Sequence, residues 1–196
     1  MPDKTKSDLD ATAEAAIFIG DATELRVSRP RCPSGFIFFS DYKQFTSLKY
    51  NDICACNTYL CELTRGYSGS NSDNALHVAD KVAERLSTGV PPGLGVLYLH
   101  DKGLTNIDLF ANRNVLLMTP WMKRQGELAV AEHEAATSRG VASSRIVIEQ
   151  IFGEIRKSKV INETSRLGRA HELDLEMEVA RCFANWRPPT NDWLQE

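Results

Sequence analysis

Two short apolar runs, each leading to an aspartate, stand out in the hydrophobic pattern of the chain. Residues 15–19 form an apolar run bounded by Gly20, which predicts a strand buried on both faces and brings Asp21 to its carboxyl end. Residues 94–99 form a similar run that leads into Asp101. We therefore expect an aspartate at the carboxyl end of each of these buried strands.

Other strand signals lie between and after these runs. Residues 35–39 are apolar and aromatic, and residues 47–63 mix β-branched and aromatic side chains with turn residues at 51–52 and at Asn57. We expect a meander of antiparallel strands in this part of the chain. Residues 115–118 predict one more strand.

Amphipathic periods predict the helices, at residues 75–86, 105–112, 127–157 and 171–186. The expected N-cap is Ser72 or Asp73 for the first helix and Thr105 for the second. The third helix carries Glu149 and is expected to break near residues 139–140, where a glycine interrupts the pattern. Along the chain, strands come first and are followed by a region that contains both strands and helices. This order indicates an α/β fold with one sheet flanked by helices.

Length and composition fit a single globular domain, because the chain has 196 residues, of which 42% are hydrophobic and 25% charged. We expect residues 1–14 to be a flexible N-terminal tail, residues 15–188 to be the domain, and residues 189–196 to be a C-terminal tail. No apolar run is long enough to span a bilayer, and the start of the chain is too polar for a secretory signal. We therefore expect an intracellular protein without membrane contact.

The net charge limits the kinds of nucleic-acid binding that the sequence allows. A formal charge of −3 and a pI near 5.9 argue against broad, sequence-independent coating of DNA, which needs many lysines and arginines. Residues 139–169 nevertheless concentrate basic side chains, at Arg139, Arg145, Arg156, Lys157, Lys159, Arg166 and Arg169. This cluster predicts either a local basic surface or a solvated helix face.

The cysteines predict neither a disulfide framework nor a zinc site. The chain has 5 cysteines, an odd set without paired C-x-x-C spacing, so we expect reduced thiols that mostly pack as small hydrophobes. The histidines also lack metal-ligand spacing. The tryptophans fit the core or the C-terminal tail better than stacking on bases.

The candidate catalytic residues are Asp21, Asp101 and Glu149. Ligands of α/β sheets gather at the carboxyl ends of strands, so the two aspartates and the helical glutamate are expected to cluster at one edge of the sheet. Clustered carboxylates repel one another unless cations neutralise them. Hard oxygen ligands select Mg²⁺ or Mn²⁺, and a pair of such ions about 3.5 to 4 Å apart supports phosphodiester cleavage. With 26 acidic residues in the chain, the spacing alone is a weak signal.

Short motifs in a fixed order strengthen this interpretation. They are Gly20-Asp21-Ala22-Thr23-Glu24 with Arg29-Pro30 behind it, residues 41–50 with Tyr42-Lys43 near their start, Gly69-Ser70-Asn71-Ser72-Asp73, Asp101-Lys102-Gly103 after its apolar strand, and the helical residues 145–156 around Glu149. In these motifs the chain resembles, over nearly its whole length, the DDE superfamily endonucleases derived from PIF/Harbinger-like and bacterial insertion-sequence transposases. The resemblance puts Asp21, Asp101 and Glu149 at the three metal-ligand positions.

The resemblance implies an RNase H-like fold, with helices on both faces of a mixed sheet, and a metal-dependent DNA endonuclease or transposase domain with two bound Mg²⁺ or Mn²⁺ ions. In a eukaryote it implies a nuclear location. The candidate DNA contacts are Lys43, Lys49, Lys102 and Arg145. Lys43 and Lys49 equally fit exposed strand positions, and Arg145 equally fits an i,i+4 pair with Glu149.

The chain departs from the family pattern at three positions. His100 stands where alanine is usual, Leu104 replaces an aromatic residue and Arg156 replaces a lysine. His100 either tunes Asp101 or is a structural neighbour, and its position at a strand end favours the second interpretation. None of these changes touches the three carboxylates.

The chain begins almost at its first catalytic strand, upstream of which such transposases usually carry a helical DNA-binding region. We therefore expect a separate DNA-binding protein to supply target recognition, and a homo-oligomer is compatible with this organisation. The alternative function is a truncated or domesticated transposase that no longer cuts and serves as a DNA- or protein-binding module.

Overall fold

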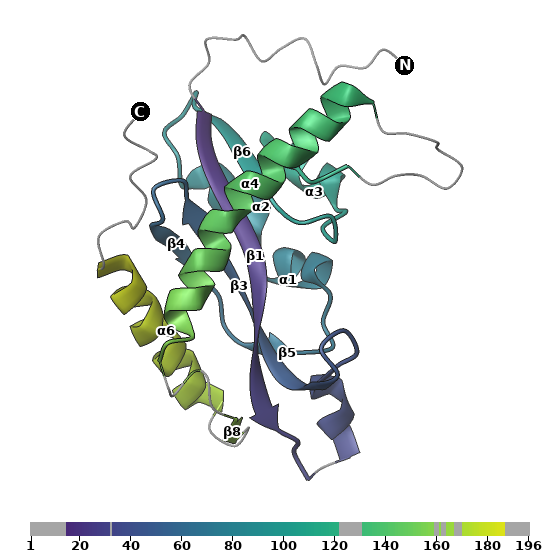
Figure 1. Cartoon of the computed structure of the whole chain (residues 1–196), viewed down its shortest axis with the longest axis vertical. Helices are drawn as coiled ribbons and strands as arrows, with labels where there is room; N and C mark the ends of the chain where they lie inside the picture. The colour runs from purple at the N-terminus through teal and green to yellow at the C-terminus, as the bar shows by residue number, and fades with distance from the viewer. Residues whose placement is uncertain are drawn as a thin grey trace.

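The computed structural model describes residues 15–31, 33–121, 131–158, 161, 164–166 and 170–186, so both predicted tails lie outside it. A long central strand, β1 (Ala15–Ser28), runs through the middle of the sheet (Figure 1). The strands follow the order β2-β3-β1-β6-β7, while β4 and β5 pair with β3, and β8 pairs with β1. Their bounds are β2 (Phe39–Ser40), β3 (Phe45–Ala55), β4 (Leu60–Leu63), β5 (Tyr67–Ser68), β6 (Gly95–Leu99), β7 (Val115–Met118) and β8 (Ser165–Arg166).

The sheet is mixed, as the sequence predicts. β1 runs antiparallel to β3 and parallel to β6, and β6 runs parallel to β7. The parallel pairing ends at Ile19 and Leu99, whereas the pairing with β3 continues to Arg26. The expectation that the first strand ends at Gly20 is therefore wrong, because β3 provides hydrogen-bond partners for the second half of β1. Asp21 lies at the end of the parallel ladder but in the interior of a strand.

Helices cover both faces of this sheet. α4 (Glu132–Ile155) crosses one face diagonally in front of β1, and α6 (Ala170–Trp186) packs against it (Figure 1). α1 (Asp73–Ala79), α2 (Val82–Thr88) and α3 (Ile107–Ala111) lie on the other face. Among the described residues, no helix is both long and apolar enough to cross a membrane.

The alternation of side chains along the strands builds a separate core on each face. Ile19 and Leu25 of β1 pack with Ile148 of α4 and Met177 of α6 in the first core. In the second core, Tyr98 of β6 belongs to the same cluster as side chains from α2 and α3. The central strands thus hold the two helical layers in fixed positions.

The strand predicted at residues 35–39 is wrong. Residues Pro33–Phe38 form a 3-10 helix, η1, and only Phe39–Ser40 pair with β3. Pro33 fixes its own φ near the helical value and has no N–H to donate to a strand. A side chain at Gly35 would lie 2.7 Å from the Pro30 carbonyl oxygen, so the chain turns tightly here. The Phe36 side chain is 65% exposed and is therefore not part of the core.

The helix predicted at residues 75–86 is divided into α1 and α2. Lys81 adopts a left-handed backbone conformation with φ of 51°, which interrupts the helical hydrogen bonds between them. The predicted cap is confirmed at Ser72, whose side-chain oxygen accepts a hydrogen bond from the Ala75 N–H at 3.2 Å. Asp73 is then the first helical residue rather than the cap.

The starts and breaks of later helices differ from the predictions. α3 begins after Asn106 rather than after Thr105, because the Asn74 side-chain oxygen accepts hydrogen bonds from the backbone N–H groups of both residues. The break predicted near residues 139–140 is wrong, since α4 continues through Gly140 and Val141 is buried against the core. Core packing therefore outweighs the low helix propensity of glycine.

The expectations for the cysteines and the tryptophans are confirmed only in part. The described cysteines, at positions 54, 56, 61 and 182, are free as expected, but among them only Cys54 is buried, so the expectation that most of them pack in the core is wrong. A core position for Trp186 is wrong, because its side chain is 82% exposed at the end of α6, and Trp121 is 41% exposed.

Candidate active site

Asp21 and Asp101 both lie just beyond one end of the parallel pairing of β1 and β6. Each comes two residues after the last paired positions, Ile19 of β1 and Leu99 of β6. Ile19 and Leu99 both belong to the core under α4, so strand alternation directs Asp21 to that face as well. The positive charge of Arg145 on α4 contributes to the lowered pKa of Asp101.

Arg145 joins two of the three predicted catalytic carboxylates. Its Nη2 atom donates a hydrogen bond to Asp21 Oδ2 at 3.1 Å and lies 3.9 Å from Glu149 Oε1. The i,i+4 pair with Glu149 is thus present, but the shorter contact crosses from the helix to the central strand. The Asp21 and Arg145 side chains are 20% and 21% exposed, whereas Glu149 is 60% exposed and retains rotamer freedom.

Asp101 is held by its neighbours in sequence. Its Oδ1 atom accepts hydrogen bonds from His100 Nδ1 at 3.1 Å and from the Gly103 N–H at 2.8 Å. The hydrogen bond from His100 is the main cause that lowers the pKa of Asp101 to about 2, with a further contribution from Arg145. Asp101 is therefore ionised at neutral pH.

The three carboxylates do not form a ready-made metal-ligand cluster. Within the described part of the chain, no three His, Cys, Asp or Glu side chains gather into a group that could hold a metal ion. A guanidinium group, that of Arg145, is instead the cation that Asp21 and Glu149 share. The structure thus links Asp21 and Glu149 through Arg145, whereas Asp101 is related to this pair by the electrostatic effect of the same arginine.

A fourth carboxylate, which sequence reasoning missed, lies next to Asp21. Asp52 of β3 is paired directly across from Asp21 and is fully buried. It forms an ion pair and hydrogen bond with Arg181 of α6, which is 1% exposed. Burial raises the pKa of Asp52 to about 6, although Arg181 opposes the shift. The sequence pattern at residues 51–52 had indicated a turn, whereas both residues lie inside β3.

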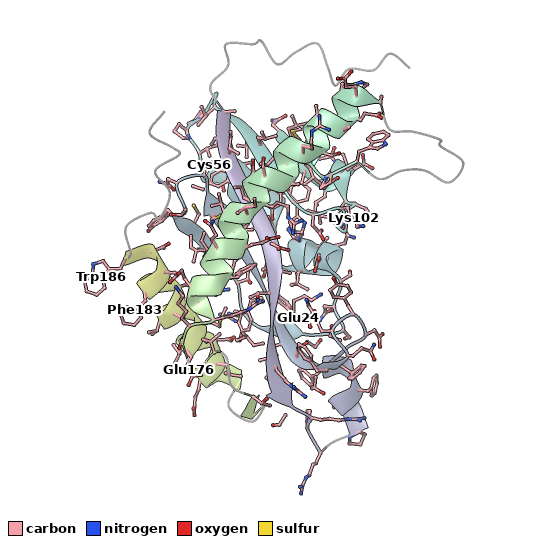
Figure 2. The ribbon with its side chains drawn as sticks, viewed as in Figure 1. Glu24, Cys56, Lys102, Glu176, Phe183 and Trp186 are labelled. Carbon is pink, nitrogen blue, oxygen red and sulfur yellow. The ribbon has the colours of Figure 1, made fainter. Side chains whose placement is uncertain are left out.

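Lys49, a predicted DNA contact, is occupied by a network within the protein. Its Nζ atom lies 3.2 Å from Asp73 Oδ1, 2.9 Å from the Asn71 carbonyl oxygen and 3.7 Å from Glu24 Oε1. Glu24, labelled beside β1 in Figure 2, also accepts a hydrogen bond from Ser47 at 2.7 Å. This network connects three of the sequence motifs, and the Lys49 side chain is only 13% exposed.

The other candidate lysines face solvent. Lys43 is exposed in the turn before β3, with its Nζ atom 4.9 Å from the centre of the exposed Tyr42 ring. Lys102 is exposed on the loop directly after Asp101 (Figure 2). Both side chains are therefore free to meet a large anionic ligand, which Lys49 is not.

Comparisons with known proteins identify the family and the fold of the chain. A family model described as DDE superfamily endonuclease matches residues 20–185. Among solved structures, the chain is similar to a piggyBac transposase in a synaptic complex with hairpin DNA, with a TM-score of 0.55 and 13% sequence identity. The match covers 89% of this chain and 47% of that chain, so this chain spans about half the length of that transposase. At this identity the likeness shows the shared fold, the RNase H-like mixed sheet. No curated protein matches the chain.

Proposed function

Because this chain belongs to the DDE superfamily endonucleases, we propose that it cleaves DNA phosphodiester bonds and that Asp21, Asp101 and Glu149 are its catalytic triad. The observation that carries the proposal is the position of Arg145, which contacts Asp21 at 3.1 Å and Glu149 at 3.9 Å and acts electrostatically on Asp101. Residues from β1, α4 and the end of β6 thus surround one positive charge. A divalent cation would have to take the place of this guanidinium among the carboxylates.

The donor set fits Mg²⁺ or Mn²⁺. All three side chains offer carboxylate oxygens, which hard divalent cations prefer, and Asp101 is ionised at neutral pH. Asp21 and Asp101 would hold the ions from the strand side and Glu149 from the helix side. Two such ions supply activation of the attacking oxygen and stabilisation of the departing oxygen.

The candidate catalytic side chains differ in how firmly the protein holds them. Asp101 is held by two hydrogen bonds, and Asp21 Oδ1 accepts the Ala22 N–H at 2.8 Å, so both aspartates are restrained. Glu149 is 60% exposed and is able to swing toward them. Arg145 neutralises the carboxylates in the metal-free protein. Once displaced from Asp21, its guanidinium is available to bind a DNA phosphate.

A nicking experiment tests the proposal. Supercoiled plasmid DNA is incubated with the protein at low salt, with and without Mg²⁺ or Mn²⁺. We expect metal-dependent nicking that Asp101→Asn abolishes and that Glu178→Gln, an exposed acidic position on α6, leaves unchanged. Nicking that persists in Asp101→Asn would refute the assignment of the triad.

A second candidate function is a transposase-derived module that no longer cuts and binds DNA or protein. It is favoured by the absence of a formed metal-ligand group among the described residues, together with the net charge of −3. Titration with Mn²⁺ separates the two functions. If Mn²⁺ raises the unfolding temperature without any nicking of plasmid DNA, the module is favoured over the endonuclease.

A further inference from the structure

A buried cluster of three rings contacts Asp101 and the residue before Asp21. His77 of α1, Tyr98 of β6 and His100 are each 0% exposed. The ring centres of His77 and His100 are 4.8 Å apart, and the two planes are nearly perpendicular at 85°. Tyr98 lies 5.8 Å from both histidine rings, measured between ring centres. The cluster therefore connects α1 to the end of the strand that carries Asp101.

The hydrogen bonds of His77 fix the direction of the Tyr98 hydroxyl group. His77 Nδ1 lies 2.7 Å from the Asp73 carbonyl oxygen, which only accepts, so Nδ1 carries the proton. His77 Nε2 then accepts a hydrogen bond from the Tyr98 hydroxyl group at 2.9 Å. The Tyr98 oxygen sits against the backbone of β1, because a side-chain carbon at Gly20 would lie only 1.8 Å from it. Tyr98 thus supports the residue that precedes Asp21.

His100 acts on the other aspartate. Asp101 Oδ1 only accepts in its ionised form, so the 3.1 Å contact requires that His100 Nδ1 donate its proton. Oδ1 also accepts the Gly103 N–H, and two donors therefore converge on one oxygen. The His100 Nε2 atom is buried and has no hydrogen-bond partner. Nδ1 is therefore the ring nitrogen through which His100 acts on Asp101.

We propose that His100 is a positioning residue that saturates Asp101 Oδ1 and so directs Oδ2 toward the divalent cation. Tyr98 and His77 hold this histidine and the backbone before Asp21 in one rigid unit, which sets the spacing of the two aspartates. The inference rests on the proposed function, because it assigns Asp101 as a ligand. Partners behind a ligand that fix its orientation commonly change metal affinity by about 10- to 100-fold when removed.

Matched substitutions at His100 separate positioning from simple core filling. The side-chain nitrogen of Asn occupies nearly the same place as Nδ1 of His, so His100→Asn keeps the donor, whereas His100→Leu fills the space without a donor. The Kd for Mn²⁺ is measured by calorimetry on the full chain, with thermal unfolding of each metal-free variant as the control for folding. We expect His100→Asn to stay within about 3-fold of the unsubstituted protein and His100→Leu to bind at least about 10-fold more weakly.

Nitrogen NMR of the metal-free protein provides a readout that does not depend on metal binding or on the folding of a variant. We expect Nδ1 of the His100 ring to carry a proton, as the 3.1 Å contact with Asp101 requires. An Nδ1 atom without a proton would overturn the inference, as would equal Mn²⁺ affinity in the unsubstituted protein and in a folded His100→Leu variant.

Failure of the proposed function gives a different result. In that case Asp101→Asn does not reduce Mn²⁺ binding by the protein. The positioning role of His100 is then disproved together with the proposed function. Metal binding that depends on Asp101 but not on His100 overturns the positioning role alone.

Discussion

Arg145 Nη2 lies 3.1 Å from Asp21 Oδ2 and joins α4 to the central strand. Both side chains are about four-fifths buried, so the contact is shielded from much of the solvent that weakens surface ion pairs. The same guanidinium is 3.9 Å from Glu149. In the metal-free protein, Arg145 therefore supplies the positive charge that these carboxylates need.

Replacing Arg145 with Gln is expected to destabilise the metal-free protein and to strengthen its response to metal. The loss of a hydrogen bond between charged groups costs about 1 to 2 kcal/mol, and the carboxylates then repel one another. Because the competing guanidinium is gone, Mn²⁺ should raise the unfolding temperature more in Arg145→Gln than in the unsubstituted protein. Arg139→Gln, an exposed change on the same helix, is the control. Equal metal responses in all three proteins would contradict this role of Arg145.

Arg181→Met is expected to destabilise the fold strongly, because it leaves Asp52 buried without its partner. Removing one member of a buried ion pair costs about 3 to 5 kcal/mol. Urea unfolding measures the change. The double substitution Asp52→Leu with Arg181→Met removes both charges and should recover most of the lost stability. If the single and double variants are equally unstable, the ion pair is not the cause.

Local sequence patterns predict which strands and helices carry the candidate site residues. Two buried runs followed by Asp21 and Asp101 are enough to bring these residues to one edge of a parallel pair, and the register of β1 and β6 agrees with that expectation. The amphipathic period likewise places Glu149 on α4. Strand and helix periodicity depend on near neighbours in sequence, which is why they are readable without a structure.

Long-range partners are the part that the sequence does not reveal. Asp52 and Arg181 are 129 residues apart, and neither carries a local signal of the other. Asp21 and Arg145 are 124 residues apart, so only the near partner Glu149 was foreseen for that arginine. The pairing of β3 with the far half of β1 also decides that residues 51–52 lie in a strand rather than a turn. Such contacts follow from tertiary packing, which overrides local propensity.

The candidate lysines are expected to separate into DNA contacts and a structural residue. Lys43→Gln and Lys102→Gln should each weaken binding to a short duplex and lower the slope of log Kd against log salt by about 1, because each lysine is exposed and able to meet one phosphate. Lys49→Gln should instead lower the unfolding temperature, since it breaks the contacts with Asp73 and Glu24. Fluorescence anisotropy and thermal unfolding measure the two effects. A Lys49→Gln variant that loses DNA affinity at unchanged stability would contradict this division.

Protonation of His77 is expected to make the fold sensitive to acid. Burial is the main cause that lowers the pKa of His77 to about 3 in the folded protein, with His100 adding to the shift, whereas an unfolded chain has a histidine pKa of about 6.5. Between these values the unfolded state binds more protons than the folded state, so stability rises with pH. The stability that neutral His77 contributes is fully present above about pH 6.5. Between about pH 6.5 and pH 3 it decreases by about 1.4 kcal/mol for each pH unit.

Urea unfolding between pH 4 and 8 measures this dependence, with His77→Gln as the comparison. The glutamine keeps a polar group near Tyr98 but does not titrate, so its stability curve should be flatter below pH 6.5 even if it is lower overall. His133→Gln, an exposed change on α4, should leave the slope unaltered. Parallel curves for His77→Gln and the unsubstituted protein would show that the buried ring is not the source of the acid sensitivity. Other titratable groups, carboxylates or the remaining histidines, would then supply it.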